Sequence, residues 1–311
     1  MDNVCHTLVG IAAAGAGLST RTRLATATLA ISANLPDLDV LVFATGVPSV
    51  AFRRGWTHGV VAQLLLPVAF AGAMWLWARR KRTRVFTSAA DAVPNSFGWL
   101  LALSLIGIYS HVFLDYLNTY GVRLLMPLSA HWFYGDAVFI VDVWLWSMLG
   151  IGAWRARNGN RRPARIGLAA ASLYVVVMLL SAGSARAIVA GEWASVTGNP
   201  AVGLMVGPVP LDPLRKDIIV DAGNHYVTGS FNWIPLRVVF DASQIPKNDR
   251  HPAVAEARND PKVRGILVWS RFPFWTVKTA DGATRVTLRD VRFAGMDRGG
   301  FSATTTVPEQ D

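Results

Sequence analysis

Long apolar runs with almost no charge are the feature that most restricts how this chain can fold. Residues 59–78 carry no charged side chain. As a helix they are long enough to cross a hydrocarbon core of roughly 30 Å. Residues 97–117, 137–154 and 164–182 are similarly apolar and predict three further spans. The chain is 52% hydrophobic and only 16% charged, unlike an ordinary soluble protein. We therefore expect an α-helical integral membrane bundle with four spans.

The first forty residues contain two shorter apolar segments, residues 4–18 and 24–36. They predict a short N-terminal helical hairpin, either two thin spans or a re-entrant or interfacial pair, and we favour two short helices that enter the bilayer. Residues 1–7 contain no Lys or Arg, so the N-terminus lacks the basic region of a secretory signal. Cys5 is the single cysteine, which excludes an internal disulfide and favours a small apolar helix residue.

Beyond residue 190 the composition changes, and Gly, Pro and charged residues return. Short runs rich in Val, Ile, Phe, Trp and Thr predict strands at 217–221, 227–233, 236–240, 265–269, 273–278 and 284–293. We expect a helical membrane domain at residues 1–190 and a small β-rich extramembrane domain at residues 195–311.

Basic residues explain the formal net charge of +10 and indicate how the chain is oriented. They cluster at Arg21 and Arg23, at residues 79–84 and at residues 155–165, each time beside an apolar stretch. This is typical of cytoplasmic loops between spans rather than of a nucleic-acid surface. Six crossings follow, in an inner (cell) membrane, with the C-terminal domain on the non-cytoplasmic side.

The same topology brings histidines and aspartates to one outer face. The candidate residues are His6, Asp37, Asp39, His58, His111, Asp115, Asp136 and Asp142. His111 and Asp115 are four residues apart and project from one helix face. Ionisable groups near membrane depth are costly unless paired or liganded. We therefore predict a metal site with the nitrogen and oxygen ligands that zinc or manganese accepts, with a purely structural polar network as the alternative.

Arg54 lies beside these residues in the sequence, and its planar guanidinium suits a phosphate or carboxylate. Arg53 and Arg54 stand in a loop that the charge pattern places outside. They are therefore either headgroup anchors or, for Arg54, the residue that holds an anionic substrate. His131 is a weak candidate ligand, and we expect His225 and His251 to be ordinary histidines of the β-rich domain.

Several motifs occur in an order that resembles a known family. They are Met1-Asp2-Asn3, His6-Thr7-Leu8-Val9-Gly10, Asn34-Leu35-Pro36-Asp37-Leu38-Asp39, Arg54-Gly55-Trp56-Thr57-His58, and His111 with Asp115 and Asn118-Thr119-Tyr120-Gly121. Over roughly residues 1–182 the chain resembles the YdjM-like family of membrane-bound, metal-dependent hydrolases, which is distantly similar to the zinc-dependent phospholipase C and nuclease superfamily. The resemblance implies the metal ligands His6, Asp37, His58, His111 and Asp115, with Asp39 a further ligand or a residue that supports one.

These observations predict a hydrolase that cleaves a phosphoester or related bond in a lipid-like substrate, with a divalent metal, zinc or else manganese. Asp39 or Asp136 would orient or deprotonate the attacking water, and Arg54 would hold a phosphate oxygen. The expected partners are membrane lipids and not nucleic acid. An ion-coupled transporter is the alternative, although the charges cluster at one end of the spans and no inverted repeat is visible. A catalytically inactive scaffold is the third possibility.

Overall fold

The computed structural model describes residues 1–44, 52–80, 96–280, 283–295 and 301–308. The chain forms two compact units. The first comprises Met1–Asp39, Arg54–Ala182 and Gly207–Pro213, and the second comprises Val40–Arg53, Gly183–Val206 and Leu214–Asp311. The long helix α7 (Arg162–Thr197) continues from the first unit into the second.

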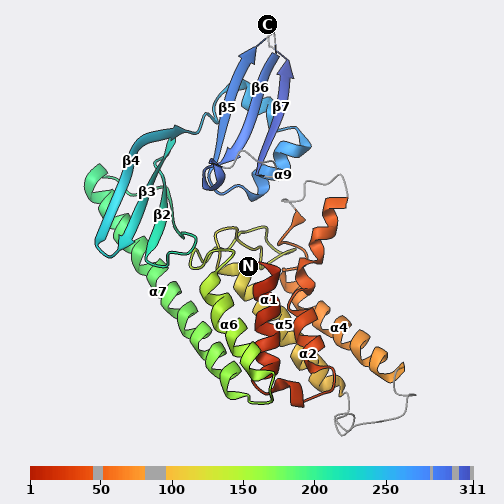
Figure 1. Cartoon of the computed structure of the whole chain (residues 1–311). Helices are drawn as coiled ribbons and strands as arrows, with labels where there is room; N and C mark the ends of the chain where they lie inside the picture. The colour runs from red at the N-terminus through yellow and green to blue at the C-terminus, as the bar shows by residue number, and fades with distance from the viewer. Residues whose placement is uncertain (45–51, 81–95, 281–282, 296–300, 309–311) are drawn as a thin grey trace. The chain divides into compact units, whose positions relative to one another are not determined.

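The first unit is helical (Figure 1). Besides the start of α7 it contains α1 (Asn3–Gly15), α2 (Ala25–Ser32), α4 (Val60–Arg80), α5 (Phe97–Tyr116) and α6 (Val143–Ala156), with the 3-10 helices η1 (Leu18–Thr20) and η2 (Leu35–Ala44), the latter continuing into the second unit. Within the described residues, α4, α5 and α7 are long and apolar enough to cross a membrane. The predicted spans at residues 59–78, 97–117 and 164–182 correspond to these three helices.

The span predicted at residues 137–154 is not confirmed. Residues 137–142 are not helical, and α6 begins only at Val143. The carboxylate of Asp142 accepts hydrogen bonds from the backbone N–H groups of Trp144 and Leu145, both at 3.0 Å, and so caps the helix. A helix of 14 residues is about 21 Å long, which is shorter than a hydrocarbon core of roughly 30 Å.

The N-terminal segments form the two expected short helices, and both pack closely. A Cβ atom added at Gly10 of α1 would lie 2.8 Å from the carbonyl oxygen of Leu29 on α2. A Cβ atom at Gly107 of α5 would collide with Ser32 at the end of α2. Glycine therefore lets α2 contact both α1 and α5 at backbone distance.

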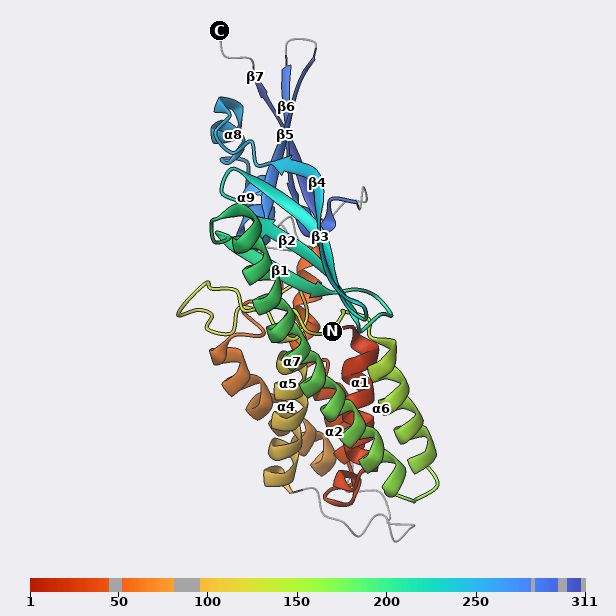
Figure 2. The same ribbon diagram turned by 90° about the vertical axis from the view of Figure 1, so that its left-hand side faces the viewer.

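The helical core lies where α1, α5, α6 and α7 meet, and Figure 2 shows these helices side by side. Its buried side chains include Cys5, Leu114, Leu117, Leu145, Leu149, Val175 and Met178. Cys5 is fully buried within this cluster, as expected for an apolar helix residue.

The second unit is rich in β-sheet, as predicted. Its first sheet has the order β1-β2-β3-β4 and consists of β1 (Gly203–Pro208, whose last two residues belong to the first unit), β2 (Arg215–Asp221), β3 (His225–Trp233) and β4 (Leu236–Pro246). Strands β2 to β4 pair antiparallel. Val189 and Trp193, on the last turns of α7, pack with Val220 and Phe231 of this sheet. One apolar helix face thus covers one sheet face.

The second sheet has the order β5-β6-β7 and is covered by two short helices. These elements are α8 (Pro252–Ala257), α9 (Pro261–Trp269), β5 (Pro273–Ala280), β6 (Ala283–Asp290), η5 (Val291–Phe293) and β7 (Ser302–Pro308). The strand predicted at residues 265–269 is wrong, because these residues end α9. Asp260 caps that helix by accepting from the Lys262 N–H at 2.7 Å, and Pro261 occupies its first position.

Candidate metal centre

Four buried side chains of the helical unit converge at one end of the bundle. They are Asp37, His58, His111 and Asp115, and one potential ligand atom from each lies within 4.8 Å of the others. Asp37 belongs to η2, His58 to the turn before α4, and the other two to the last turns of α5. The Nε2 atom of His111 lies 3.8 Å from Asp115 Oδ2, so the predicted pair shares one helix face. Packing of the helices thus brings together residues as far apart in the sequence as Asp37 and Asp115, which are 78 residues apart.

The ring orientation of His111 is fixed by a backbone group. Its Nδ1 atom lies 2.7 Å from the carbonyl oxygen of Ala33, at the end of α2. A carbonyl oxygen only accepts hydrogen bonds, so Nδ1 carries the hydrogen and donates it. In the neutral imidazole, Nε2 then presents a lone pair to Asp37 and Asp115, the arrangement found in histidines that bind metals.

His58 is oriented through a side-chain relay. The hydroxyl of Thr57 donates to Asp39 Oδ2 at 3.2 Å, and its oxygen lies 2.9 Å from His58 Nδ1. Because the single hydroxyl hydrogen is used on Asp39, the oxygen accepts a hydrogen from Nδ1. Asp39 Oδ2 also lies 3.7 Å from Nδ1. The lone pair of His58 Nε2 therefore faces the same point as that of His111.

With both imidazoles neutral, three hydrogen-bond acceptors consequently meet without a hydrogen between them. His58 Nε2 lies 3.1 Å from His111 Nε2 and 3.3 Å from Asp115 Oδ2. Facing lone pairs repel one another, more strongly in a buried site than in water. A divalent cation would turn that repulsion into coordination, and two imidazole nitrogens with two carboxylates form a ligand set that zinc accepts. The residues therefore fit a metal ion.

Arg54 neutralises one of these carboxylates. Its Nη2 donates to Asp115 Oδ1 at 3.0 Å, and its Nε lies 3.0 Å from Oδ2. Its Nη1 donates to Asn118 Oδ1 at 2.9 Å. The guanidinium expected to hold an anionic substrate is thus already paired with Asp115 and Asn118. Within the described residues, Asp115 Oδ2 still has no aligned hydrogen bond, and neither does the Nδ2 group of Asn118.

Asp39 stabilises the turn that carries Arg54 and His58. The backbone N–H of Arg54 donates to Asp39 Oδ2 at 2.8 Å, and Arg54 has a φ of 56°. A positive φ is unusual for a residue other than glycine. Asp39 therefore supports both the turn and the His58 ring, and it is not one of the four converging residues.

His6 lies against the cluster from the first turn of α1. Its ring stacks on that of His111 with the centroids 3.8 Å apart, and its Nε2 lies 3.5 Å from Asp115 Oδ1. The amino group of Met1 donates to the same carboxylate oxygen. His6 is outside the group of four, so its role as a metal ligand stays a prediction.

Asp136 is buried in a turn that lies against the end of α5. Its φ is 49°, and the neighbouring Gly135 N–H donates to the carbonyl oxygen of Tyr116 at 2.6 Å. Asp136 thus follows Gly135, which is bonded to Tyr116, the residue after Asp115. Asp136 does not belong to the group of four. Its predicted catalytic role is untested.

Arg123 is a buried cation near the cluster that sequence reasoning missed. Its backbone N–H donates to the carbonyl oxygen of Arg54 at 2.9 Å, and its guanidinium lies over the Trp132 ring at 4.9 Å. Burial lowers the pKa of this guanidinium, which nevertheless stays charged. The sequence does mark Arg123 in one way: like Arg53, it is a basic residue in a loop that the distribution of basic residues places outside.

The other histidines have local roles. His131 is exposed and packs edge-on against Phe133 with centroids 4.8 Å apart. His225 Nδ1 lies 2.6 Å from Asn224 Oδ1, and His251 caps α8 by accepting from the Ala253 N–H. None of the three belongs to the group of four.

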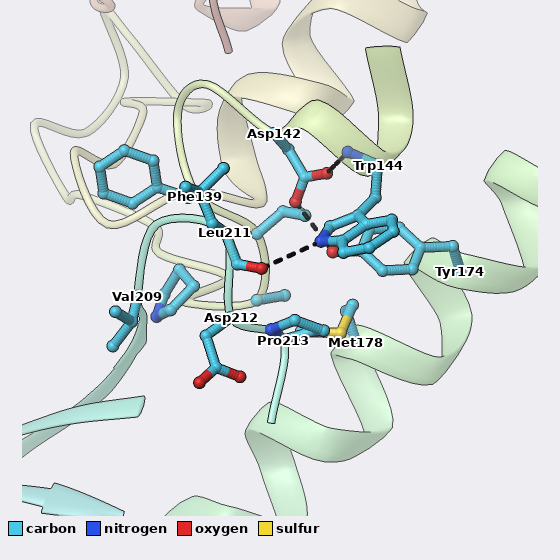
Figure 3. Close-up of a pocket in the computed structure, with 12 residues that line it drawn as sticks. Phe139, Asp142, Trp144, Tyr174, Met178, Val209, Leu211, Asp212 and Pro213 are labelled. Carbon is cyan, nitrogen blue, oxygen red and sulfur yellow. Dashed lines mark hydrogen bonds between the residues drawn. The ribbon is translucent and has the colours of Figure 1, made fainter. Parts of the chain in front are cut away.

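Asp142 lines a small pocket whose other side chains, such as Phe139, Met178 and Pro213, are mostly apolar (Figure 3). Its Oδ2 accepts from the Tyr174 hydroxyl at 2.9 Å, while its Oδ1 caps α6. Nearby, the indole N–H of Trp144 donates to the carbonyl oxygen of Leu211 at 3.2 Å (Figure 3). These bonds give Asp142 a structural role at the start of α6.

Comparison with known proteins identifies a family over the helical part of the chain. The model of the family described as "YdjM inner membrane protein" matches residues 1–185. A curated protein of Bacillus subtilis (strain 168), "Uncharacterized protein YfhP", is 22% identical over an alignment of 318 residues that covers 97% of this chain and 90% of that protein. No solved structure matches significantly.

Proposed function

The chain belongs to the YdjM inner membrane protein family, and we propose that it is a metal-dependent hydrolase that acts on a phosphoester or related bond of a lipid-like substrate. The observation that carries this proposal is the convergence of Nε2 of His58, Nε2 of His111 and a carboxylate oxygen of Asp115 in a buried site. In a purely structural polar network, one imidazole would instead be protonated and place a hydrogen between these atoms.

Asp37, His58, His111 and Asp115 would hold the ion. A bound divalent cation lowers the pKa of a water ligand to about 7 and polarises the bond to be cleaved. We propose zinc because the ligand set contains two imidazoles, with manganese as the alternative. His6, stacked on His111, is the next candidate ligand.

The surrounding residues position these ligands. Asp39 and Thr57 hold the His58 ring with Nε2 turned inward, and Arg54 holds Asp115 while balancing its buried charge. We therefore revise the roles of Asp39 and Arg54 from direct catalysis to positioning. Asp136, buried beside the end of α5, remains the candidate for accepting a proton from water.

A lipid-like substrate follows from the surroundings of the site. The ligands lie at the ends of apolar helices, and α4 and α5 expose large apolar side chains such as Leu64, Leu65 and Phe113. A headgroup at the helix ends would leave its acyl chains among such side chains within the bilayer. The buried cation Arg123 matches the negative charge of a phosphoester, whereas Arg54 is already paired with Asp115.

The test is metal analysis and phospholipid hydrolysis with the purified full-length chain. We expect about one ion or more per wild-type chain, and loss of both metal and turnover in His111→Ala and Asp37→Ala. His225→Ala, in the second unit, is the matched control and should change neither. Unchanged metal content in both cluster variants would exclude the metal site. Metal binding without turnover, but with ion uptake into proteoliposomes, would replace hydrolysis with transport.

A further inference from the structure

The end of the bundle away from the metal centre is strongly basic. The α1–α2 turn, the end of α4 and the α6–α7 turn carry nine described, exposed arginines: Arg21, Arg23, Arg79, Arg80, Arg155, Arg157, Arg161, Arg162 and Arg165. The described residues of these turns contain no Asp or Glu. Lys81, Arg82 and Arg84 continue the sequence but lie outside the described residues.

Arginine and tryptophan are paired at each of these places. The guanidinium of Arg21 lies over Trp99 at 4.7 Å, at the start of α5. Arg79 lies over Trp75 at 4.5 Å, and Arg157 lies over Trp154 at 5.0 Å. Tryptophan prefers the boundary between hydrocarbon and headgroups, and arginine prefers the phosphates just beyond it. The three pairs mark the depth at which this end meets the membrane surface.

The α6–α7 turn also contains an open hollow of about 400 Å³. It is lined by Trp154, Arg155, Arg157, Asn158, Asn160 and Pro163. Two guanidinium groups and two amides supply hydrogen-bond donors suited to phosphate oxygens. Its volume is within the range of roughly 300–1,000 Å³ common for small-molecule sites.

Apolar side chains continue from the hollow along both helices. Ile151 on α6 and Ile166 on α7 are 58% and 61% exposed, and Leu173 follows two turns further along α7 at 65%. A ligand with a charged head and apolar chains would thus contact arginine and asparagine at one end and isoleucine and leucine at the other.

We propose that this hollow binds the headgroup phosphate of an anionic phospholipid. Such binding places the arginine end of the bundle at the more anionic leaflet and the metal centre at the opposite one. The site is independent of the proposed hydrolysis, because it shares no residue with the metal centre.

Native mass spectrometry of the purified full-length chain in detergent, titrated with phosphatidylglycerol, tests the proposal. We expect Arg155→Gln/Arg157→Gln to weaken phosphatidylglycerol binding roughly tenfold or more, since each arginine near an anionic lipid contributes several-fold. The matched control is Arg258→Gln/Arg264→Gln, at the residue after α8 and on α9, which also removes an exposed arginine paired with a tryptophan, Trp275. It should change the affinity by less than about twofold, and both variants should keep their metal content.

Three results would overturn the proposal. The first is wild-type affinity for phosphatidylglycerol in Arg155→Gln/Arg157→Gln. The second is displacement of the lipid by inorganic phosphate at equal concentration, which would make the hollow a site for free phosphate instead. Equal binding of phosphatidylcholine would show that the negative charge of the lipid is not recognised, and would also count against it.

Discussion

The two units of this molecule each bury a carboxylate beside an arginine, yet the two carboxylates are treated in opposite ways. Asp115, in the helical unit, pairs with Arg54, and Asp290, in the β-rich unit, pairs with Arg292. Both aspartate side chains are fully buried. Their residue types and burial are the same, so only the remaining hydrogen bonds distinguish them.

Asp290 is saturated with donors. Its Oδ2 accepts from the Ser270 hydroxyl, from the N–H groups of Arg271 and Phe272, and from Arg292, at 2.7 to 3.2 Å. Its Oδ1 accepts from the N–H and Nε of Arg292, both at 2.9 Å. A carboxylate in this state gains nothing from another cation. The site is structural, since it joins the end of α9 to the end of β6.

Asp115 shows the opposite balance. Its Oδ2 lacks an aligned hydrogen bond among the described residues and lies 3.3 Å from His58 Nε2. Burial and ion pairing therefore do not separate a binding site from a structural pair. The difference lies in whether the acceptor atoms are already matched by hydrogens.

The largest effect should come from breaking the structural pair. Asp290→Asn leaves the Arg292 guanidinium, which is 2% exposed, without its counter-charge. We expect a loss of about 3–5 kcal/mol in the free energy of unfolding of the second sheet. Hydrogen–deuterium exchange of peptides from β5 to β7 measures it. Asp249→Asn, at an exposed carboxylate, should cost less than about 0.5 kcal/mol, and metal content should not change in either variant.

The same pair predicts a pH dependence. Burial opposes ionisation of Asp290, but the charge and hydrogen bonds of Arg292 and the Ser270 hydroxyl outweigh it and hold the pKa of Asp290 below its ordinary value. A lowered folded-state pKa contributes stability above the unfolded value of about 3.9, and that contribution is lost as the pH falls further. Exchange protection of β5 to β7 should therefore fall below about pH 4. The gap between wild type and Asp290→Asn should narrow over the same range, and a constant gap would contradict the assignment.

The cluster around Asp115, where an acceptor atom lacks a hydrogen bond, should instead be stabilised by a metal ion. At a metal concentration of 100 times the Kd, the wild-type helical unit should gain about 2.7 kcal/mol against unfolding. Asp37→Asn should gain little of this. In the presence of a chelator, however, the variant should be at least as stable as wild type, because one acceptor charge has been removed from a repelling group. Urea unfolding followed by exchange in peptides of α5 measures both. Equal stability of the wild type with and without metal would show that the cluster around Asp115 is not a metal site.

Thr57 tests whether the site depends on its supporting bonds. Thr57→Val removes the hydroxyl that links Asp39 to His58 Nδ1 while keeping the side-chain shape. Loss of such a supporting bond typically weakens metal binding about 10- to 100-fold. Thr57→Ser keeps the hydroxyl and should restore most of the affinity. Competition with a chelating dye measures the Kd. Identical values for all three proteins would show that the link from Asp39 through Thr57 to His58 does not support metal binding.

The sequence was sufficient to predict the parts that depend on composition. Uncharged apolar runs indicated α4, α5 and α7, and the alternation of basic turns brought Asp37, His58, His111 and Asp115 together. Helix ends depended on single capping bonds, which is why the span predicted at residues 137–154 is not confirmed and the strand predicted within α9 is wrong. The pairing of Arg54 with Asp115 and the relay from Asp39 depend on distances between side chains far apart in the chain. Residue types alone do not specify such distances.

The smallest expected effect concerns two helix caps, one in each unit. Asp260 accepts from the Lys262 N–H and caps α9, and Asp2 accepts from the N–H groups of Val4 and Cys5 at 2.9 and 3.1 Å and caps α1. Replacing either by alanine should cost about 1 kcal/mol of stability in its own unit. Exchange in peptides of α9 and α1 measures these losses.

The two caps should differ in their effect on metal binding. The helix that Asp2 caps carries His6, whose ring stacks on His111. Asp2→Ala should therefore also weaken metal binding, by about threefold or less, because fraying of the first turn of α1 loosens that stack. Asp260→Ala should leave the metal Kd unchanged, and Asp2→Asn, which keeps a capping oxygen, should restore it. A shift in metal affinity caused by Asp260→Ala would show that the stability of the second unit is coupled to metal binding in the first. Asp115 and Asp290 would then belong to one coupled structure and could not be contrasted as independent sites.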